Sequence, residues 1–363
     1  MMPSILFTGG GTAGHVAPNI ALIQEFRHKG WDIAYVGSAE GIESEMIKPL
    51  GIPFYSVKSG KLRRYLSVKN LLDPFKIILG IFQAFLLLAK LKPDVVFSKG
   101  GFVAFPVVVG AWLNRIPVVA HESDMSPGLA NRLCFPFVNK ICLTFEAGKK
   151  HFKNQEKIEV TGTPIREQLF SGNSAAGLAL CEFNTEKPCL LAIGGSLGAG
   201  SINRSIREAL PRLTQNYQVI HLCGKGKKED ALMNVAGYKQ FEYANEELAD
   251  LFAAASVVVS RAGANSLYEL LALGKPHILI PLSAQVSRGD QIQNAKYFQG
   301  LGISFVIDDR SLNAETLVQA LSDLEKNKDE IFNKIKALKI KSATEQIVVI
   351  IEEQIHVQSP SAV

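Results

Sequence analysis

The chain has 363 residues, of which 47% are hydrophobic and 20% are charged, and its formal net charge is +5. This composition excludes an intrinsically disordered chain, and the length predicts about two domains. The five cysteines include no C-x-x-C pair, which argues against a disulfide framework or a cysteine zinc site and favours a reducing compartment. The amino-terminal residues lack the features of a secretory signal, and the longest apolar run, 77–89, is shorter than the about 20 residues that a membrane span needs. We therefore expect a cytosolic chain.

Short apolar runs alternate with helical stretches through the first half of the chain. Nearly continuous apolar runs are typical of strands covered on both faces, and their alternation with helices predicts a parallel sheet. The strands predicted in this half are Ser4–Thr8, Asp32–Gly37, Pro53–Val57, Asp94–Ser98, Pro117–His121, Lys140–Thr144 and Ile158–Thr161.

The same alternation starts again in the second half. The strands predicted there are Pro188–Ile193, Tyr217–Leu222, Lys239–Tyr243, Ser256–Ser260, His277–Pro281 and Ile303–Ile307. The predicted fold class is therefore α/β, with two doubly wound parallel-sheet (Rossmann-like) domains that face an interdomain cleft. We expect residues 1–163 and 164–339 to form the domains, with a C-terminal helix at about 340–363 that can pack back on the first.

Glycine-rich turns follow the first predicted strand of each half, at residues 9–14 and 194–200. The first matches the G-x-G-x-x-G pattern of dinucleotide-binding proteins, in which glycines let the backbone approach a phosphate. Such proteins also need an acid at the end of the second strand. That strand ends in Gly37-Ser38, and the first acid beyond it is Glu40, so a nicotinamide-dependent oxidoreductase is disfavoured.

The segment 256–282 predicts a second phosphate site. An apolar strand ends in Arg261, small residues follow at 262–266, and Glu269 lies about one turn into the next helix. Small residues at a helix start expose N–H groups to a pyrophosphate, and a carboxylate there can accept both hydroxyls of a ribose. The alternative is a Ser or Asn helix cap with Glu269 as its capping-box partner. The chain has no G-x-x-x-x-G-K-[ST] loop, so the pattern favours a nucleoside diphosphate.

A basic segment precedes the longest apolar run. Between Lys58 and Lys76 lie six basic residues and one acid, Asp73, for a local charge of +5. Two interpretations stay open: a core helix beside a solvated loop, or an interfacial surface that meets lipid and anionic headgroups. Nucleic acid is a weaker candidate because no nucleic-acid motif appears.

Seven segments together carry a resemblance to a known family. They are residues 8–18, 92–96 with 100–102, 116–122, 162–166, 194–199, 260–264, and 290–291 with 294–295. In this order, over almost the whole chain, they resemble the MurG-type N-acetylglucosaminyltransferases of peptidoglycan synthesis, which have the two-domain GT-B fold. Here Ser123-Asp124 and Asp290 differ from residues that some members have at these positions.

The resemblance implies transfer of N-acetylglucosamine from UDP-N-acetylglucosamine to the 4-hydroxyl of the muramoyl sugar of lipid I, with UDP and lipid II as products. The anomeric centre inverts, which fits a single in-line displacement. It also implies a role in cell-wall growth, cell shape and division. The closest alternative is a UDP-N-acetylglucosamine 2-epimerase on the same fold, and a catalytically inactive scaffold is a further one.

The resemblance also implies site residues in this chain. Glu269 would bind the ribose, Arg166 would stabilise the leaving group, and the backbone near Ala244 would meet the uracil. The implied donor-binding residues are Thr12, Ala13, Gly14, Asp124, Arg166, Ser196, Ala244, Ala264, Asn265, Ser266, Glu269, Asp290 and Gln291. The implied acceptor-pyrophosphate residues are Gly10, Gly11, Gly14, Gly100 and Gly101.

His15 is the first candidate for the general base, because its ordinary pKa suits proton transfer near neutrality. Two alternatives stay open: His15 only donates a hydrogen bond to phosphate or sugar, or Glu122 or Asp124 is the base. His121 is interpreted as a core histidine. No cofactor or metal site is expected, although a divalent cation could act as an activator.

The lipid-linked acceptor implies that the first domain docks on an anionic membrane at its cytoplasmic face, as a peripheral protein. The residues expected at this contact are Lys61, Arg63, Arg64, Lys69, Phe75, Lys76, Phe82 and Phe85.

Overall fold

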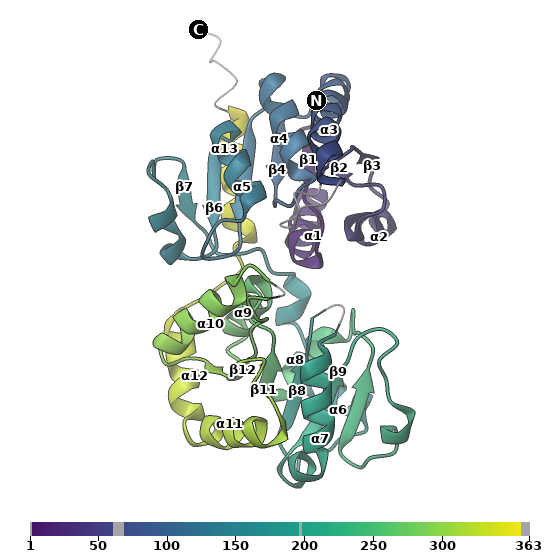
Figure 1. Ribbon diagram of the computed structural model, residues 1–363, viewed down its shortest axis with the longest axis vertical. Helices are drawn as coiled ribbons and strands as arrows, with labels where there is room; N and C mark the ends of the chain where they lie inside the picture. The colour runs from purple at the N-terminus through teal and green to yellow at the C-terminus, as the bar shows by residue number, and fades with distance from the viewer. Residues whose placement is uncertain (1, 61–68, 196–197, 286, 357–363) are drawn as a thin grey trace. The chain divides into compact units, whose positions relative to one another are not determined.

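The computed structural model describes residues 2–60, 69–195, 198–285 and 287–356. Two compact units divide the chain: Met1–Ile165 with Ser342–Val363, and Arg166–Lys341. We call them unit 1 and unit 2. Each has its own parallel sheet with helices on both faces (Figure 1).

Unit 1 contains a seven-stranded sheet with the order β3-β2-β1-β4-β5-β6-β7. Its strands are β1 (Ser4–Thr8), β2 (Asp32–Gly37), β3 (Phe54–Ser56), β4 (Val95–Ser98), β5 (Val118–Glu122), β6 (Lys140–Leu143) and β7 (Ile158–Val160). Its helices are α1 (Ala13–His28), α2 (Ile42–Ile47), α3 (Lys69–Leu91), α4 (Ala104–Leu113), α5 (Leu129–Cys134) and α13 (Thr344–His356), with 3-10 turns at Lys48–Leu50, Phe135–Phe137 and Glu146–His151.

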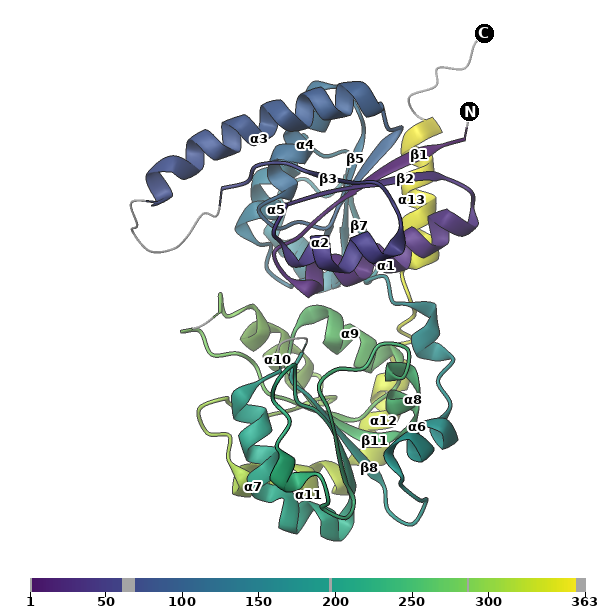
Figure 2. The same cartoon turned by 90° about the vertical axis from the view of Figure 1, so that its right-hand side faces the viewer.

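Side chains that alternate along the strands of unit 1 enter two separate cores. Ile5 and Phe7 on β1 pack with residues of α1, α2 and α13, whereas Leu6 between them packs with residues of α3, α4 and α5. Figure 2 shows α3 and α4 on one face of this sheet and α1 and α13 on the other. Because both faces are covered, each strand is apolar at nearly every position.

Unit 2 contains a six-stranded sheet with the order β10-β9-β8-β11-β12-β13. Its strands are β8 (Cys189–Ile193), β9 (Gln218–Leu222), β10 (Tyr238–Phe241), β11 (Ala255–Ser260), β12 (His277–Leu279) and β13 (Phe305–Val306). Its helices are α6 (Ser174–Cys181), α7 (Gly200–Asn216), α8 (Leu248–Ala254), α9 (Ala264–Ala272), α10 (Asp290–Gly300), α11 (Ala314–Lys326) and α12 (Lys328–Ala337), with 3-10 turns at Glu167–Phe170 and Asp230–Leu232.

Every strand predicted from the sequence is present, with small differences at the ends. The C-terminal helix α13 packs against α1 and β4 of unit 1. The units divide after Ile165 and after Lys341, close to the expected boundaries. The functions expected for the two domains, and the cleft between them, stay predictions.

The order of strands reverses at one point in each sheet, between β1 and β4 in unit 1 and between β8 and β11 in unit 2. Ligands of doubly wound sheets bind beyond the carboxyl ends of the strands at such a point. The glycine turns after β1, β4 and β8 and the small-residue turn after β11 all lie there. Topology therefore brings the predicted phosphate-binding segments of each unit together.

Candidate active site

The turns after β1 and β4 are in backbone contact. The N–H of Gly10 donates to the carbonyl of Gly100 over 3.2 Å. A Cβ atom at Gly101 would lie 2.2 Å from the Gly10 carbonyl oxygen, and Gly101 has a positive φ of 86°. Only glycine fits there without a shift of the backbone. The two segments predicted to bind the acceptor pyrophosphate thus form one surface.

Two N–H groups of the first turn already have partners in the protein. Gly10 donates to Gly100, and Gly11 donates to the Glu43 carboxylate over 3.1 Å. While these bonds hold, neither group can also give its full hydrogen bond to a phosphate. Gly10 leaves space for the Glu43 carboxylate, so it is Gly11, where a Cβ atom would have no described atom within 4 Å, that is proposed to let a ligand approach the backbone closely. Gly14 lies in the first turn of α1, next to Thr12 and Ala13 at the helix start.

His15 is half-buried, and its ring is oriented by the same turn. Its Nδ1 lies 2.9 Å from the carbonyl oxygen of Gly10 and 3.3 Å from the Thr12 hydroxyl. A carbonyl oxygen only accepts, so the hydrogen bond requires a proton on Nδ1. In the neutral ring Nε2 is then the nitrogen that takes up a proton, as a general base must.

Glu122 lies at the end of β5, and its buried carboxylate holds the following loop. Oε1 accepts the N–H of Asp124 over 2.9 Å, and Oε2 accepts the N–H of Gly128 over 3.0 Å and the amide of Asn131 over 2.9 Å. These donors occupy the carboxylate, so its geometry fits an anchor better than a base. Asp124 is half-buried in the loop that Glu122 holds.

Lys99 is a buried cation next to Gly100 that the sequence analysis missed. Its Nζ lies 2.6 Å from Nδ1 of His121 and also donates to the hydroxyl of Ser123. Burial lowers the pKa of Lys99 to about 7, although Glu122 and Asp124 oppose that shift. A lysine directly after an apolar strand and directly before two glycines was the available signal.

His121 is a core histidine, as expected. Its side chain is buried, and its Nε2 donates to the carbonyl of Gly162 over 2.8 Å. Its Nδ1 can then accept the hydrogen bond from Lys99. Burial, followed by the neighbouring Lys99 charge, holds the pKa of His121 well below its ordinary value, so the ring is neutral.

In unit 2 the helix α9 begins at Ala264, and Gly263 is its N-cap. Its first N–H groups are those of Ala264, Asn265 and Ser266, the residues predicted to receive a pyrophosphate. The alternative interpretation of Ser or Asn as a cap with Glu269 as capping-box partner is wrong, because the cap is a glycine and makes no side-chain bond. Ser196 lies outside the described residues.

Glu269 is half-buried and carries no side-chain hydrogen bond within the part of the chain that is described. Burial raises its pKa to about 7, and the Arg166 guanidinium partly opposes the shift. The Nε of Arg166 is itself buried with no partner among the described residues. A carboxylate and a guanidinium Nε that lack hydrogen-bond partners among the described residues are suited to bind the polar groups of a ligand.

Two further residues predicted to bind the sugar donor lie at the start of α10. The Gln291 side-chain oxygen accepts the N–H of Leu282 over 3.1 Å, which turns its amide nitrogen toward Gly263. Asp290 forms a long ion pair of 3.9 Å with Arg288. Ala244 is half-buried and lies after β10, in the mostly exposed stretch that leads to α8.

A charged network joins the two turns of unit 2 and was also missed. Arg261 donates to the Asp309 carboxylate over 2.7 Å and to the Ser201 hydroxyl over 2.9 Å. Ser201 in turn donates to Asp309 over 2.6 Å. The start of α7 is therefore tied to the end of β11. The motif around Arg261 was noticed in the sequence, but its distant partner Asp309 was not predictable.

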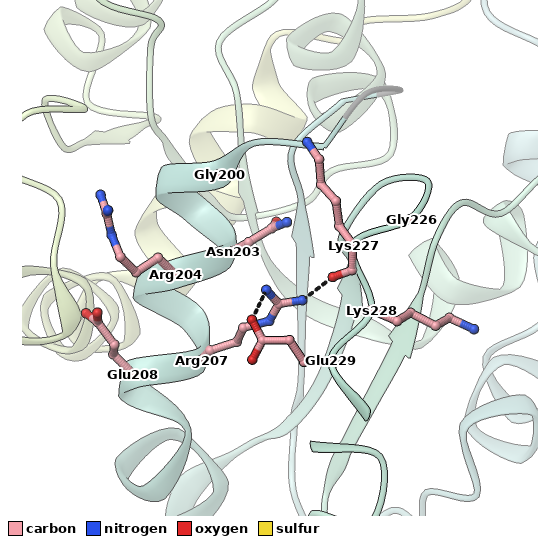
Figure 3. A pocket seen from close by; sticks show the side chains of 9 residues that line it. All are labelled: Gly200, Asn203, Arg204, Arg207, Glu208, Gly226, Lys227, Lys228 and Glu229. Carbon is pink, nitrogen blue, oxygen red and sulfur yellow. Dashed lines mark hydrogen bonds and ion pairs between the residues drawn. The ribbon is translucent and has the colours of Figure 1, made fainter. Parts of the chain in front are cut away.

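A hollow of about 630 Å³ lies between α7 and the loop after β9 (Figure 3). Arg207 crosses it and pairs with Glu229 over 2.5 Å. Its lining residues are Gly200, Asn203, Arg204, Arg207, Glu208, Gly226, Lys227, Lys228 and Glu229. None of them is among the individually predicted site residues, although Gly200 ends the glycine turn 194–200 and Lys227 donates to the carbonyl of Gly198 in that turn.

Helix α3 exposes a row of large apolar side chains. Phe75 is 71% exposed and Phe82 is 58% exposed, while Phe85 is half-buried and Lys76 pairs with Asp73. Lys61, Arg63 and Arg64 lie outside the described residues, and so does the side chain of Lys69.

The stretch Asp73–Leu91 of α3 has a mean hydropathy of 1.7 and is long enough, by length and composition alone, to cross a membrane. The expectation of a stretch too short to span is therefore wrong for the helix by this measure, because it counted only residues 77–89. No cluster of His, Cys, Asp and Glu that could hold a metal occurs in the described ranges.

Residues 5–143 match the glycosyltransferase family 28 N-terminal domain, and residues 189–350 match the family's C-terminal domain. The chain therefore belongs to glycosyltransferase family 28 and is a transferase. The crystal structure of Acinetobacter baumannii MurG is similar, with a TM-score of 0.76 and 26% identity over 97% of this chain and 99% of that one. The predicted GT-B fold is confirmed.

Two relatives have the same descriptive name, UDP-N-acetylglucosamine–N-acetylmuramyl-(pentapeptide) pyrophosphoryl-undecaprenol N-acetylglucosamine transferase. The protein of Legionella pneumophila strain Lens is 76% identical over 100% of both chains. That of Clostridium perfringens strain ATCC 13124 is 51% identical over 97% of this chain and 98% of its own. A UDP-GlcNAc 2-epimerase from Neisseria meningitidis shares only the fold, at 14% identity and a TM-score of 0.67.

Proposed function

We propose that this chain is the inverting transferase that moves N-acetylglucosamine from UDP-N-acetylglucosamine to the 4-hydroxyl of the muramoyl sugar of lipid I, giving lipid II and UDP. The observation that carries the proposal is the full-length 76% identity with a relative named for this reaction. The epimerase alternative is not favoured, because its similarity stays at the level of the fold.

Unit 2 is proposed to bind the donor. The ribose hydroxyls donate to the Glu269 carboxylate, and the pyrophosphate lies at the start of α9, where the helix N–H groups and dipole favour an anion. Ser196 takes part in the same pyrophosphate contact. The Arg166 charge next to Glu269 stabilises the negative charge that develops on UDP as it leaves.

Sugar and base contacts complete the proposed donor site. Gln291 contacts donor hydroxyls from the start of α10, next to the N-cap of α9, and Asp290 lies beside it. The backbone near Ala244 meets the uracil. These roles rest on the positions that match the family's motifs and on the place of the Gln291 amide nitrogen, which would be in van der Waals contact, at 3.9 Å, with a Cβ atom at Gly263.

Unit 1 is proposed to bind the acceptor and to supply the base. His15 takes the proton of the attacking hydroxyl on Nε2, because its Nδ1 is held by the Gly10 carbonyl. The second candidate is Asp124, which Glu122 positions from behind through the Asp124 N–H. Within the joined turns 9–14 and 99–102, Gly11 is proposed to let the acceptor pyrophosphate approach the backbone, because a Cβ atom there would have no described atom within 4 Å.

We also propose that α3 docks unit 1 on the cytoplasmic face of the membrane, as a peripheral contact. One side of α3 buries Ala84 and Leu88 in a core of unit 1, while Phe75 and Phe82 point to solvent. A Cβ atom at Gly80 would lie 1.9 Å from the carbonyl oxygen of Lys58, so α3 lies directly on the backbone of its own domain. This packing favours a helix in the plane of the interface over one that leaves the domain to span the bilayer.

Measuring UDP release with and without a lipid I analogue tests the reaction. We expect release only with the acceptor, together with a disaccharide product. Formation of the manno epimer from UDP-N-acetylglucosamine alone would support the epimerase instead.

Flotation with anionic vesicles tests the docking surface. We expect Phe75→Ser with Phe82→Ser, or neutralisation of Lys61, Arg63 and Arg64, to weaken binding, whereas Phe332→Ser on α12 of unit 2 is the matched control.

A further inference from the structure

The carboxylate of Glu43 is buried beside the first glycine turn. Its Oε2 accepts the N–H of Gly11 over 3.1 Å, and its Oε1 accepts the N–H of Ser38 over 2.9 Å and the Ser38 hydroxyl. Burial raises the pKa of Glu43, but the hydrogen bonds from Ser38 and Gly11 outweigh it and hold the pKa below its ordinary value. A fully buried charge is therefore kept next to the turn that carries the proposed base.

Three glycines from separate segments leave the space that this carboxylate fills. A Cβ atom at Gly10 would lie 2.4 Å from Cδ of Glu43, one at Gly37 2.6 Å from Cγ, and one at Gly41 2.3 Å from a carboxylate oxygen. A side chain at any of the three would displace the carboxyl group. The three glycines therefore leave a space that the carboxyl group of Glu43 fills closely.

The bond to Glu43 also determines where the carbonyl of Gly10 points. The carbonyl of Gly10 and the N–H of Gly11 belong to one planar trans peptide, so they point in opposite directions. Glu43 holds the N–H end, and Nδ1 of His15 donates to the carbonyl end over 2.9 Å. A negative partner on the N–H side also polarises the peptide and makes the carbonyl a stronger acceptor.

We propose that Glu43 is a positioning residue for His15: it orients the Gly10–Gly11 peptide, whose carbonyl keeps the imidazole in the Nδ1–H tautomer and leaves Nε2 to take the acceptor's proton. The proposal rests on the transferase function and on His15 as its base. It goes beyond them because Glu43 itself touches neither substrate nor the reacting atoms.

The variant Glu43→Gln tests the proposal, with Glu45→Gln as the matched control, an exposed acid on the same helix. The first readout is the ¹⁵N NMR spectrum of the imidazoles in the ligand-free protein, with His15 assigned by its absence in His15→Ala. We expect the Nδ1–H tautomer in the wild type and in Glu45→Gln, and a mixture of tautomers in Glu43→Gln. This measurement needs no turnover, so it tests the positioning even if the proposed transfer is wrong.

The second readout is steady-state kinetics. We expect Glu43→Gln to lower kcat by up to about 100-fold, as small misplacements of a catalytic group do, with KM for UDP-N-acetylglucosamine unchanged. In a His15→Ala background the same substitution should have no further effect on kcat, because the group that it positions is absent. Equal losses in both backgrounds, or an unchanged His15 tautomer, would overturn the proposal. If Glu43→Gln does not fold, Ser38→Ala, which removes one donor to Glu43, carries the same two readouts.

Discussion

Glu43 and Glu269 are glutamates next to a phosphate-type turn, one in each unit, and their surroundings are opposite. Glu43 is fully buried and accepts hydrogen bonds from Ser38 and Gly11, so its pKa lies below the ordinary value. Glu269 is half-buried, and burial raises its pKa to about 7 while the Arg166 charge partly opposes that shift. The protein itself donates hydrogen bonds to the Glu43 carboxylate. The Glu269 carboxylate accepts no hydrogen bond from the described residues, and we propose that a ligand donates to it.

The comparison gives a way to separate anchors from ligand-binding groups. Hydrogen bonds to the charged form favour ionisation, whereas burial without donors disfavours it. A carboxylate that the fold satisfies contributes to the shape of a loop, and Glu122 belongs with Glu43 in this respect. A carboxylate that the fold leaves unsatisfied is available to the hydroxyls of a nucleotide.

The largest effect is expected for Glu269→Ala. Two hydrogen bonds from a ribose to a charged acceptor contribute roughly 3–6 kcal/mol, so affinity for UDP should fall at least about 100-fold. The melting temperature should not fall, because the substitution removes a half-buried acid whose charged form is disfavoured by desolvation. Calorimetric titration with UDP and a thermal scan measure both. If Glu269→Ala kept its affinity for UDP, Glu269 would not bind the ribose, and the proposed contrast with Glu43 would be wrong.

Glu122→Gln should instead lower mainly the stability of the fold. An amide can accept as Oε1 does but cannot satisfy all three donors, so stability should fall by roughly 1–3 kcal/mol. UDP affinity should fall less than in Glu269→Ala, because Glu122 acts only through the position of Asp124, whereas Glu269 is proposed to bind the ribose itself. Denaturant unfolding measures the loss. A stable variant with abolished turnover would instead support Glu122 as the base.

The pH dependence of UDP binding should follow Glu269. Its pKa of about 7 in the free protein means that the carboxylate is largely protonated below pH 7. Ribose hydroxyls bind the ionised form, so affinity should weaken as pH falls from 7 toward 5, by up to about tenfold per pH unit. Glu269→Gln should flatten this part of the profile. An equally steep profile in that variant would assign the dependence to another group.

The last prediction concerns Lys99, the buried cation of unit 1. Its pKa is lowered from 10.5 to about 7, so between these values the unfolded chain binds more protons than the folded one. The wild type should therefore gain stability relative to Lys99→Met as pH rises from 7 to 10, by at most about 1.4 kcal/mol per pH unit. Unfolding curves for both proteins across this range measure the difference. A constant difference would mean that Lys99 stays charged in the fold.

Much of the fold was predictable from local patterns. The apolar runs at 4–8 and 255–260 are strands because a strand covered on both faces must be apolar at nearly every position. The glycine turns after β1 and β8 could be found because glycine is conspicuous where a backbone must make a close approach. Exact ends were less predictable: β13 keeps only Phe305–Val306 of the expected run 303–307.

The candidate site was predictable only in part. His15 and Glu269 stand out by type and position, whereas Glu43, Lys99 and Asp309 carry no local signal of the same strength. Glu43 lies 32 residues from the N–H that it accepts, and Arg261 lies 48 residues from Asp309. A local sequence pattern cannot predict these contacts, because the two residues of each pair come together only when the strands assemble into a sheet.

The sequence by itself determined the strand–helix alternation, the two repeated sheets and the chemical types present at the turns, because these follow from periodicity and from the special backbone freedom of glycine. Tertiary structure alone decided which acids are anchors and which are open to a ligand. That distinction depends on how many donors surround each carboxylate and how much water is excluded, and both are set by segments that meet only in the folded chain.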